Sequence, residues 1–244
     1  MSDRIRLDLA IEARKLLPSR ARARDAILRG TVTVNGALAF RPNQMVGDAD
    51  RIELDDPAAR YVSRAALKLI AGLDAGGIDV EGKTCLDVGA STGGFTQVLL
   101  ERGAAKVFAV DVGHDQLNQR IRNDAKVVVL ESQNARELTR ELIPDPIDLL
   151  VCDVSFVSVT KVLAAPLSLC RSGADAVILI KPQFEVGLAH IGKGGIVTDE
   201  AAIEAATSDV IRFMAGCGFR HRLSVLSPIA GGDGNREIVA VFRS

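Results

Sequence analysis

The sequence predicts an α/β protein in which a large domain with a doubly wound, mainly parallel sheet follows a small N-terminal α/β domain. Three observations support this prediction. After residue 59, short apolar strand segments alternate with helical patterns, which is typical of parallel sheets covered by helices. A glycine-rich turn, "DVGASTGGF", joins the first of these strands to a helix. The first 58 residues differ from the rest in their excess of arginine.

The small domain, residues 1–58, combines two short helices with strands. The helical patterns are "RLDLAIEARKLL" and "SRARARDAILRG", and the second begins at Ser19, a good N-cap, and closes at Gly30. The β-branched segment "TVTVNG" predicts a strand that ends in an Asn-Gly turn, and "DRIELDD" predicts a second strand. The polar, proline-containing stretch 55–62 is the expected linker to the domain at 59–244.

Charge is unevenly distributed along the chain. The net charge is −1, yet residues 1–47 contain nine Lys/Arg and only four Asp/Glu. A basic segment on a nearly neutral protein is typical of a nucleic-acid-binding surface. Charge alone fits a solvated, arginine-rich helix face equally well.

The order of residues in this segment resembles the S4 RNA-binding domain. The matching residues are Arg6-Leu7-Asp8, Ser19-Arg20, Ala26-Ile27, Gly30 and "VTVNG". The resemblance implies that the arginines hold RNA through its phosphates, which fixes position rather than sequence. A small protein-binding module is the alternative. The RNA contacts expected from the resemblance are Arg4, Arg6, Arg14, Lys15, Arg20, Arg22 and, in the larger domain, Arg64.

Seven strands are expected in the larger domain. Their ranges are 84–89, 106–112, 126–131, 147–154, 176–181, 222–228 and 237–242. Helices are expected at 92–102, 157–170 and 199–215, the last with Thr198 as N-cap. Another helix is expected to begin at Ser63, with Arg64 and Lys68 on the side away from its apolar stripe.

Charged residues stand near the ends of four of these strands. Asp87, Asp111, Asp153 and Lys181 each lie at or near the carboxyl end of an apolar run. Ligands of open α/β sheets bind at that edge. Three carboxylates and an amine at one edge therefore predict a functional site.

The glycine-rich turn favours S-adenosyl-L-methionine over a dinucleotide. The dinucleotide pattern requires glycine at its first, third and sixth positions, and the middle one is Ser91 here. Asp87 would repel a pyrophosphate but attract the ammonium and sulfonium charges of S-adenosylmethionine. Asp111 is expected to accept hydrogen bonds from ribose hydroxyls. The expected cofactor-binding residues are Asp87, Gly89, Ala90, Ser91, Gly93, Gly94, Phe95, Asp111, Asn134 (near the adenine) and Asp153 (toward the methyl group).

Six segments together resemble the TlyA family. They are "SRAALKL", "LDVGASTGGFT", "VDVG", "CDVSF", "LIKPQFE" and "NREIVAVF". These proteins join an S4 domain to an FtsJ-like, Rossmann-like methyltransferase domain. The resemblance implies S-adenosylmethionine-dependent methylation of cytidine 2′-hydroxyls in ribosomal RNA, with ribosomal RNA or a ribosomal subunit as partner. It also implies a catalytic set, here Lys68, Asp153, Lys181 and Glu237.

The chemistry of methyl transfer to a hydroxyl explains this set. A ribose hydroxyl is a poor nucleophile, so a group must take its proton or stabilise the developing oxyanion. We expect Lys181 to contact the hydroxyl in one of these two roles. Asp153 and Glu237 would orient the amines. Glu237 begins its strand, so it reaches the site only if the last strand is antiparallel.

Other activities fit the sequence less well. Methylation of a base nitrogen usually requires a Pro-Pro-aromatic motif where this chain has "DVSF". Methylation of cytosine C5 requires a nucleophilic cysteine, and Cys152 lies one residue inside its strand. Methylation of a small molecule would leave the basic domain without a purpose. A non-enzymatic RNA-binding or ribosome-assembly factor is the stronger rival, and a membrane-active haemolysin, a name used in this family, is the weaker.

Composition sets the remaining limits. The four cysteines form no CxxC pair and read as reduced thiols, and the three histidines are scattered, so we expect no metal site. The N-terminus lacks the apolar core of a signal peptide, and no apolar run approaches the roughly 20 residues of a membrane span. We therefore expect a cytoplasmic protein without a membrane partner.

Overall fold

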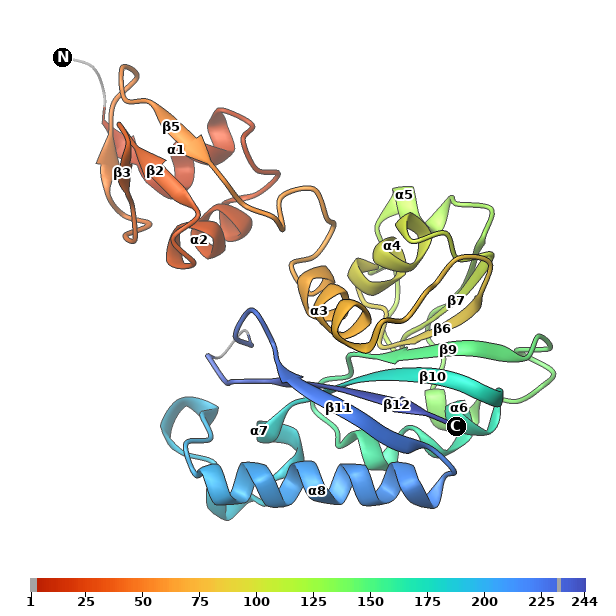
Figure 1. Ribbon diagram of the computed structural model, residues 1–244. Helices are drawn as coiled ribbons and strands as arrows, with labels where there is room; N and C mark the ends of the chain where they lie inside the picture. The colour runs from red at the N-terminus through yellow and green to blue at the C-terminus, as the bar shows by residue number, and fades with distance from the viewer. Residues whose placement is uncertain (1–3, 232–233) are drawn as a thin grey trace. The chain divides into compact units, whose positions relative to one another are not determined.

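The computed structural model describes residues 4–231 and 234–244, and the chain folds as two compact units (Figure 1). The N-terminal unit is Met1–Arg60 and the C-terminal unit is Tyr61–Ser244. The division falls two residues after the boundary expected from the sequence. Each unit has its own hydrophobic core.

The N-terminal unit packs two helices beside short antiparallel strands. Leu7, Ile11 and Ile27 of the helices are fully buried together with Val32 of the central strand. Ser19 caps the second helix, as predicted, because its hydroxyl accepts the N–H of Arg22. The elements are α1 (Leu7–Ala13), α2 (Arg20–Leu28), the sheet of β3 (Ala37–Leu38), β2 (Val32–Val34) and β5 (Ile52–Leu54), and the pair of β1 (Ile5–Arg6) with β4 (Met45–Val46).

The C-terminal unit contains the predicted seven-stranded sheet. Its order is β11 (Arg220–Leu226), β12 (Ile238–Arg243), β10 (Cys170–Ile180), β9 (Ile147–Cys152), β6 (Thr84–Val88), β7 (Lys106–Val110) and β8 (Val127–Leu130). β12 lies antiparallel to both of its neighbours, and the other paired strands run parallel. The prediction of one reversed strand is therefore confirmed.

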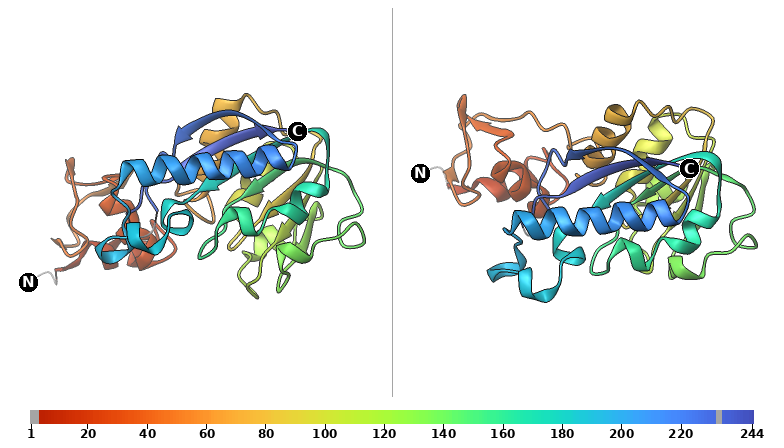
Figure 2. Two further views of the ribbon diagram at one scale, coloured as in Figure 1. Left: turned by 90° about the horizontal axis from the view of Figure 1, so that it is seen from below. Right: turned by 60° about the horizontal axis from the view of Figure 1, so that its bottom comes forward.

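Helices cover both faces of this sheet (Figure 2). On one face, Leu69 of α3 (Ala66–Gly76) and Val98 of α4 (Gly94–Glu101) belong to the same buried cluster as Val177 of β10. On the other, Met214 of α8 (Glu200–Gly216) shares a cluster with Ile178. Successive strand residues point to opposite faces, so the apolar run of β10 serves both cores. The shorter helical elements are α5 (Gln119–Arg122), α6 (Ala164–Ser168), α7 (Pro182–Glu185) and the 3₁₀ turns Ala135–Glu137, Val159–Lys161, Leu188–His190 and Lys193–Gly195.

Two predicted helix caps were wrong by one or two residues. Ser63 does not cap α3; its hydroxyl accepts the N–H of Ala65 within a tight turn, and Ala65 is the N-cap. The cap of α8 is Asp199 rather than Thr198, because the Asp199 carboxylate accepts the N–H of Ala202 at 3.1 Å. A carboxylate at this position also interacts favourably with the helix dipole.

The continuous helix predicted for 157–170 was also wrong. The segment forms a 3₁₀ turn, Val159–Lys161, and then the short helix α6. Pro166 explains the break, because proline is tolerated in the first turn of a helix but disrupts its interior. The backbone N–H of Val159 is instead bonded to the side chain of Glu185.

The cysteines are reduced, as predicted. Cys85 and Cys152 are fully buried, and burial raises the pKa of each thiol to about 12. Neither is therefore a nucleophile at neutral pH. Within the described residues, no helix combines the length and the apolar character needed to cross a membrane.

Candidate active site

The topology brings the predicted charged residues to one edge of the sheet. Asp153 directly follows β9, and Lys181 directly follows β10. Asp111 follows β7 in the same direction. Glu237 directly precedes β12, and because β12 is reversed its start lies at the edge where its neighbours end.

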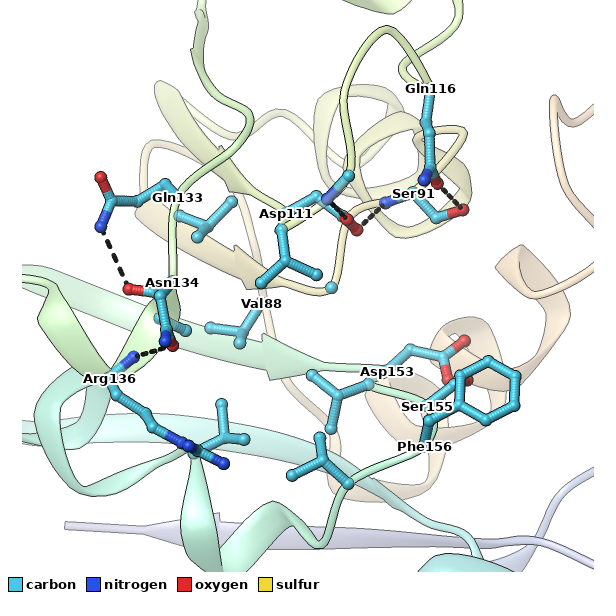
Figure 3. A pocket seen from close by; sticks show the side chains of 18 residues that line it. Val88, Ser91, Asp111, Gln116, Gln133, Asn134, Arg136, Asp153, Ser155 and Phe156 are labelled. Carbon is cyan, nitrogen blue, oxygen red and sulfur yellow. Dashed lines mark hydrogen bonds between the residues drawn. The ribbon is translucent and has the colours of Figure 1, made fainter.

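A cavity of about 620 Å³ runs along this edge (Figure 3). Gln133, Asn134 and Arg136 lie at one end of it, whereas Asp153 and Phe156 lie at the other. The volume is within the usual range for small-molecule sites. The other lining residues are Val88, Gly89, Ser91, Val110, Asp111, Val112, Gly113, Gln116, Ala135, Val154, Ser155, Val157 and Val162.

Asp111 ties the glycine-rich turn to the loop that follows β7. One carboxylate oxygen accepts the backbone N–H of Ser91 at 2.8 Å, and the other accepts that of Gly113 at 2.7 Å. Each carboxylate oxygen has a second lone pair. The carboxylate therefore fixes the shape of the turn and keeps lone pairs that can accept further hydrogen bonds.

Glu131 also binds the loop that follows β7. Its carboxylate accepts the backbone N–H groups of Asp115, Gln116 and Leu117 at 3.0–3.1 Å and pairs with Arg122. The Leu117 N–H and Arg122 bring the pKa of this carboxyl down to about 2. Gln116 lines the cavity and accepts the Ser91 hydroxyl. Sequence reasoning missed Glu131, although it directly follows a strand.

The glycines of the turn are explained by packing within the protein. A Cβ at Gly89, where φ is +86°, would lie 2.8 Å from the carbonyl oxygen of Asp153. A Cβ at Gly94 would lie 2.8 Å from the side chain of Ser63. Both glycines were expected to be cofactor-binding residues. In the structure they allow the turn to pack closely on the neighbouring loops.

Asp87 lies beneath the turn rather than in the cavity wall. Its side chain is fully buried and accepts the Thr96 hydroxyl at 2.6 Å. Its other oxygen has no hydrogen-bond partner among the described residues. Burial, opposed by the Thr96 hydrogen bond, raises the pKa of Asp87 to about 7. Asp87 can therefore change charge near neutral pH.

A smaller cavity, of about 140 Å³, shares Gly89, Ser91, Asp153 and Ser155 with the larger one. Lys181 lines it. The other residues in its wall are Ser63, Ala65, Ala90, Thr92, Gly94 and Phe95. The predicted Ala90, Gly94 and Phe95 thus lie near Lys181, whereas Asn134 lies at the far end of the larger cavity.

Lys181 and Asp153 form a buried ion pair in this smaller cavity. The Lys181 amine is 2.6 Å from the Asp153 carboxylate and donates a hydrogen bond to the Ser155 hydroxyl at 2.7 Å. The Lys181 side chain is 9% exposed and the Asp153 side chain 13%. Sequence reasoning missed Ser155. The available signal was its position in "CDVSF", two residues after Asp153.

Lys68 and Glu237 form the second buried ion pair. The Lys68 amine is 2.5 Å from the Glu237 carboxylate, and the side chains are 8% and 2% exposed. Lys68 was predicted to face away from the apolar stripe of its helix, but it is buried because it reaches Glu237. Within the described residues, the four predicted catalytic side chains thus pair as Lys181 with Asp153 and Lys68 with Glu237.

The predicted RNA-binding residues are largely held by their own unit. Arg6 donates two hydrogen bonds to the buried carboxylate of Asp8, and Arg20 donates a third at 3.0 Å. The Arg6 hydrogen bond, helped by Arg20, lowers the pKa of Asp8 to about 2. Both guanidinium groups remain partly exposed. Arg4, Arg14 and Arg22 donate to backbone carbonyls, Lys15 is exposed, and Arg64 lies half-buried before α3.

Phe156 is the most conspicuous residue that the sequence analysis missed. It is 90% exposed beside Asp153, and its φ is +65°. A bulky residue in this left-handed region is an outlier that marks strain or function. An aromatic side chain three residues after a predicted catalytic acid was the available sequence signal.

Family models match almost the whole chain. Residues 61–244 match the FtsJ-like methyltransferase model, and residues 5–52 match the S4 domain model. These ranges correspond to the two units seen in the structure.

Two relatives match over nearly their full length. The 16S/23S rRNA (cytidine-2′-O)-methyltransferase TlyA of Mycobacterium tuberculosis is 44% identical over 100% of this chain and 91% of its own. The protein named Hemolysin A of Brachyspira hyodysenteriae is 42% identical over 98% of this chain and 99% of its own.

Solved structures agree with this assignment. A hemolysin-named protein of Streptococcus thermophilus is 34% identical, with a TM-score of 0.77 over 100% of this chain and 90% of its own. A magnesium protoporphyrin IX methyltransferase from Synechocystis shares the fold alone, at 12% identity and a TM-score of 0.52 over 74% of this chain and 82% of its own. The chain therefore belongs to the TlyA family, in which an S4 domain is joined to an FtsJ-like methyltransferase domain.

Proposed function

We propose that this protein transfers a methyl group from S-adenosylmethionine to the 2′-hydroxyl of a cytidine in ribosomal RNA. The observation that carries this proposal is the position of the Lys181–Asp153 pair. It lies in a small cavity that shares Asp153 and Ser155 with a cavity of cofactor size. An amine that donates hydrogen bonds is thus located where donor and acceptor would meet.

The larger cavity fits S-adenosylmethionine. Its wall offers the Asp111 carboxylate for ribose hydroxyls and the amides of Gln133 and Asn134 for the adenine edge. Asp87, buried under the turn with one unpartnered oxygen, provides negative charge for a cationic ligand. When bound, the cofactor supplies an activated methyl group, so the protein mainly has to align the acceptor.

Lys181 is the residue that handles the acceptor hydroxyl. Asp153 and Ser155 fix its amine within 2.6–2.7 Å, so the amine is held in one orientation. In this position it either accepts the hydroxyl proton or stabilises the developing charge on oxygen. Lys68 and Glu237 form a second buried pair that is electrically balanced, which anchors the start of β12 beside α3.

Phe156 provides a surface for the target base. RNA-modifying sites commonly stack an unpaired base on an aromatic ring. Phe156 is almost fully exposed and stands at the end of the cofactor cavity where Asp153 lies. Its ring contacts that of Phe184 at a centroid distance of 5.3 Å.

The N-terminal unit supplies phosphate contacts for a structured RNA. Asp8 neutralises only one of the two guanidinium groups that share it, so Arg6 and Arg20 keep a net positive charge at the surface. We propose a ribosomal subunit as the partner, which places the reaction in the cytoplasm. A non-enzymatic role would give no reason to place the Lys181–Asp153 pair in the wall of a cavity at the edge of the sheet where ligands bind.

A methyl-transfer assay on ribosomal subunits tests the proposal. Purified small and large subunits that lack the modification are incubated with tritiated S-adenosylmethionine, and the labelled nucleotide is identified after digestion. We expect label on the ribose of cytidine, and no label with the Lys181→Ala protein. Label on a base, or none with the wild-type protein on either subunit, would refute it.

A further inference from the structure

The loop that connects Asp153 to Val159 carries much of the proposed active site. It contains Asp153, Ser155 and Phe156. Phe156 adopts a φ of +65°, and a bulky non-glycine residue in this sparsely populated region is strained. Contacts elsewhere must therefore hold the loop in this conformation.

One short segment, Lys181 to Glu185, makes these contacts. At the start of the loop, the Lys181 amine donates to the Ser155 hydroxyl. In the middle, the rings of Phe184 and Phe156 lie 5.3 Å apart and inclined by 50°. The segment is itself rigid, because it begins at the end of the central strand β10 and forms the helical turn α7.

Glu185 closes the far end of the loop. One carboxylate oxygen accepts the Ser158 hydroxyl at 2.6 Å, and the other accepts the backbone N–H of Val159 at 2.9 Å. The carboxylate is partly buried, and this burial raises its pKa. A partly buried carboxylate that accepts two hydrogen bonds from one loop holds that loop specifically, since hydrogen bonds to a charged group are stronger than those between neutral groups.

We propose that Glu185 is a positioning residue for methyl transfer: it fastens the 155–159 loop so that Phe156 is presented to the target nucleotide and Ser155 stays on Lys181. This inference rests on the proposed function, because it assumes that Phe156 meets RNA. Glu185 touches neither the cofactor cavity nor the smaller one. The loop forms only one end of the cofactor cavity, and Asp111, Gln133 and Asn134 lie outside it. The effect of Glu185 is therefore expected to be larger on the use of RNA than on cofactor binding.

Three variants test whether the hydrogen bonds of Glu185 hold the loop. Glu185→Ala removes both acceptors, and we expect kcat/KM for RNA to fall roughly 10- to 100-fold. Ser158→Ala removes one of the two bonds to Glu185, together with the contacts of Ser158 to Thr160, and should cost about 3- to 10-fold. Glu185→Gln should retain activity within about threefold, because its oxygen can accept the Val159 N–H while its amide donates to Ser158. Ser158 can then donate to Thr160, whose hydroxyl lies 2.7 Å away.

Hydrogen exchange at the Val159 amide gives a readout that needs no substrate. We expect faster exchange in Glu185→Ala than in the wild type and near-normal exchange in Glu185→Gln. The dissociation constant for S-adenosylmethionine should change less than kcat/KM for RNA in all variants, because most of the cofactor cavity lies outside this loop. Glu204→Ala, which removes an exposed glutamate of α8, is the matched control and should change neither exchange nor kinetics.

The outcomes separate this inference from the proposed function. Wild-type kcat/KM for RNA in Glu185→Ala would overturn the inference alone, whether or not exchange at Val159 is faster. Equal losses in Glu185→Gln and Glu185→Ala would also overturn it, because the hydrogen bonds would then not be what matters. Absence of RNA methylation by the wild-type protein would refute the proposed function and, with it, this inference.

Discussion

Two ion-pair clusters, one in each unit, differ in how far they are exposed to water. In the N-terminal unit, the buried carboxylate of Asp8 is shared by Arg6 and Arg20, whose side chains are 37% and 51% exposed. In the C-terminal unit, both members of the Lys181–Asp153 pair are nearly buried. The first arrangement leaves a net positive charge facing water. The second is neutral overall and is largely shielded from water.

This difference corresponds to two tasks. Phosphate binding needs mobile, solvent-facing cations that can exchange counterions for RNA. Methyl transfer needs a fixed donor in a site of low dielectric, where electrostatic stabilisation is strongest. Variants of the charged residues in both units should reveal this difference between phosphate binding and methyl transfer.

Replacement of Lys181 should have the largest effect. Lys181→Ala should reduce methyl transfer by on the order of 100- to 10,000-fold, because nothing would handle the hydroxyl proton or the charge on oxygen. Binding of cofactor and of RNA, measured by calorimetry and filter binding, should be retained. Lys181→Arg keeps the charge but is never deprotonated at neutral pH. Partial activity of the arginine variant would assign oxyanion stabilisation, and inactivity would favour the role of base. Normal turnover in Lys181→Ala would remove Lys181 from the mechanism.

Breaking the Lys68–Glu237 pair should destabilise the C-terminal unit. Lys68→Ala leaves a buried carboxylate without its cation, which costs roughly 3–5 kcal/mol. Replacing both residues by apolar ones, Lys68→Met with Glu237→Leu, should cost much less in urea denaturation. Arg212→Ala breaks an exposed pair and should change stability by no more than about 1 kcal/mol. Equal losses for the buried and the exposed pair would contradict the contrast between them.

Removal of Asp8 should destabilise the N-terminal unit more moderately. Asp8→Ala loses three hydrogen bonds to charged groups, but the arginines can turn to water, so we expect a loss of roughly 1–3 kcal/mol. The depressed pKa of Asp8 means that this stabilisation is present above about pH 3.8 and is lost as the pH falls through about 2. Thermal denaturation of the full chain at pH 7 and at pH 2 measures both effects. A loss that is the same at both pH values would show that the ion pairs are not responsible.

The raised pKa of Asp87 predicts that cofactor binding depends on pH. Its raised pKa means that the carboxyl is neutral below about pH 7 and charged above it, and only the charged form attracts a cationic ligand. S-adenosylmethionine should thus bind more tightly as the pH rises through about 7, by no more than about tenfold per pH unit. In the protein without cofactor, the contribution of this group to the free energy of unfolding is greatest below about pH 3.8 and is lost as the pH rises through about 7. Asp87→Asn should flatten both profiles, and an unchanged binding profile would remove Asp87 from cofactor recognition.

The smallest effect is expected for single arginines of the N-terminal unit. Arg20→Ala should reduce the slope of log Kobs against log salt for RNA by about 0.7–0.9, the value of one phosphate contact. Cofactor affinity should not change. An unaltered slope would show that Arg20 serves only to neutralise Asp8.

Much of this molecule was determined by local patterns in the sequence. The alternation of apolar strands with helices specified the parallel sheet, and the Asn-Gly turn and the Ser19 cap specified local structure in the N-terminal unit. The placement of Asp153 and Lys181 at one edge followed directly, because parallel strands end on the same side. Even the reversal of β12 could be inferred, since Glu237 would otherwise lie at the wrong edge.

The pairing of charged groups and their exposure to water depend on the tertiary structure. Lys68 is separated from Glu237 by 169 positions in sequence, so no local pattern specifies their pairing. Asp87 and Asp111 both lie at or near the ends of strands. Asp87 is buried under the turn and accepts the Thr96 hydroxyl, whereas Asp111 lines the cavity and accepts the Ser91 N–H. Glu185 fastens a loop that lies 26 residues before it. Burial and hydrogen bonding depend on all neighbouring elements at once, and these neighbours are assembled only by the fold.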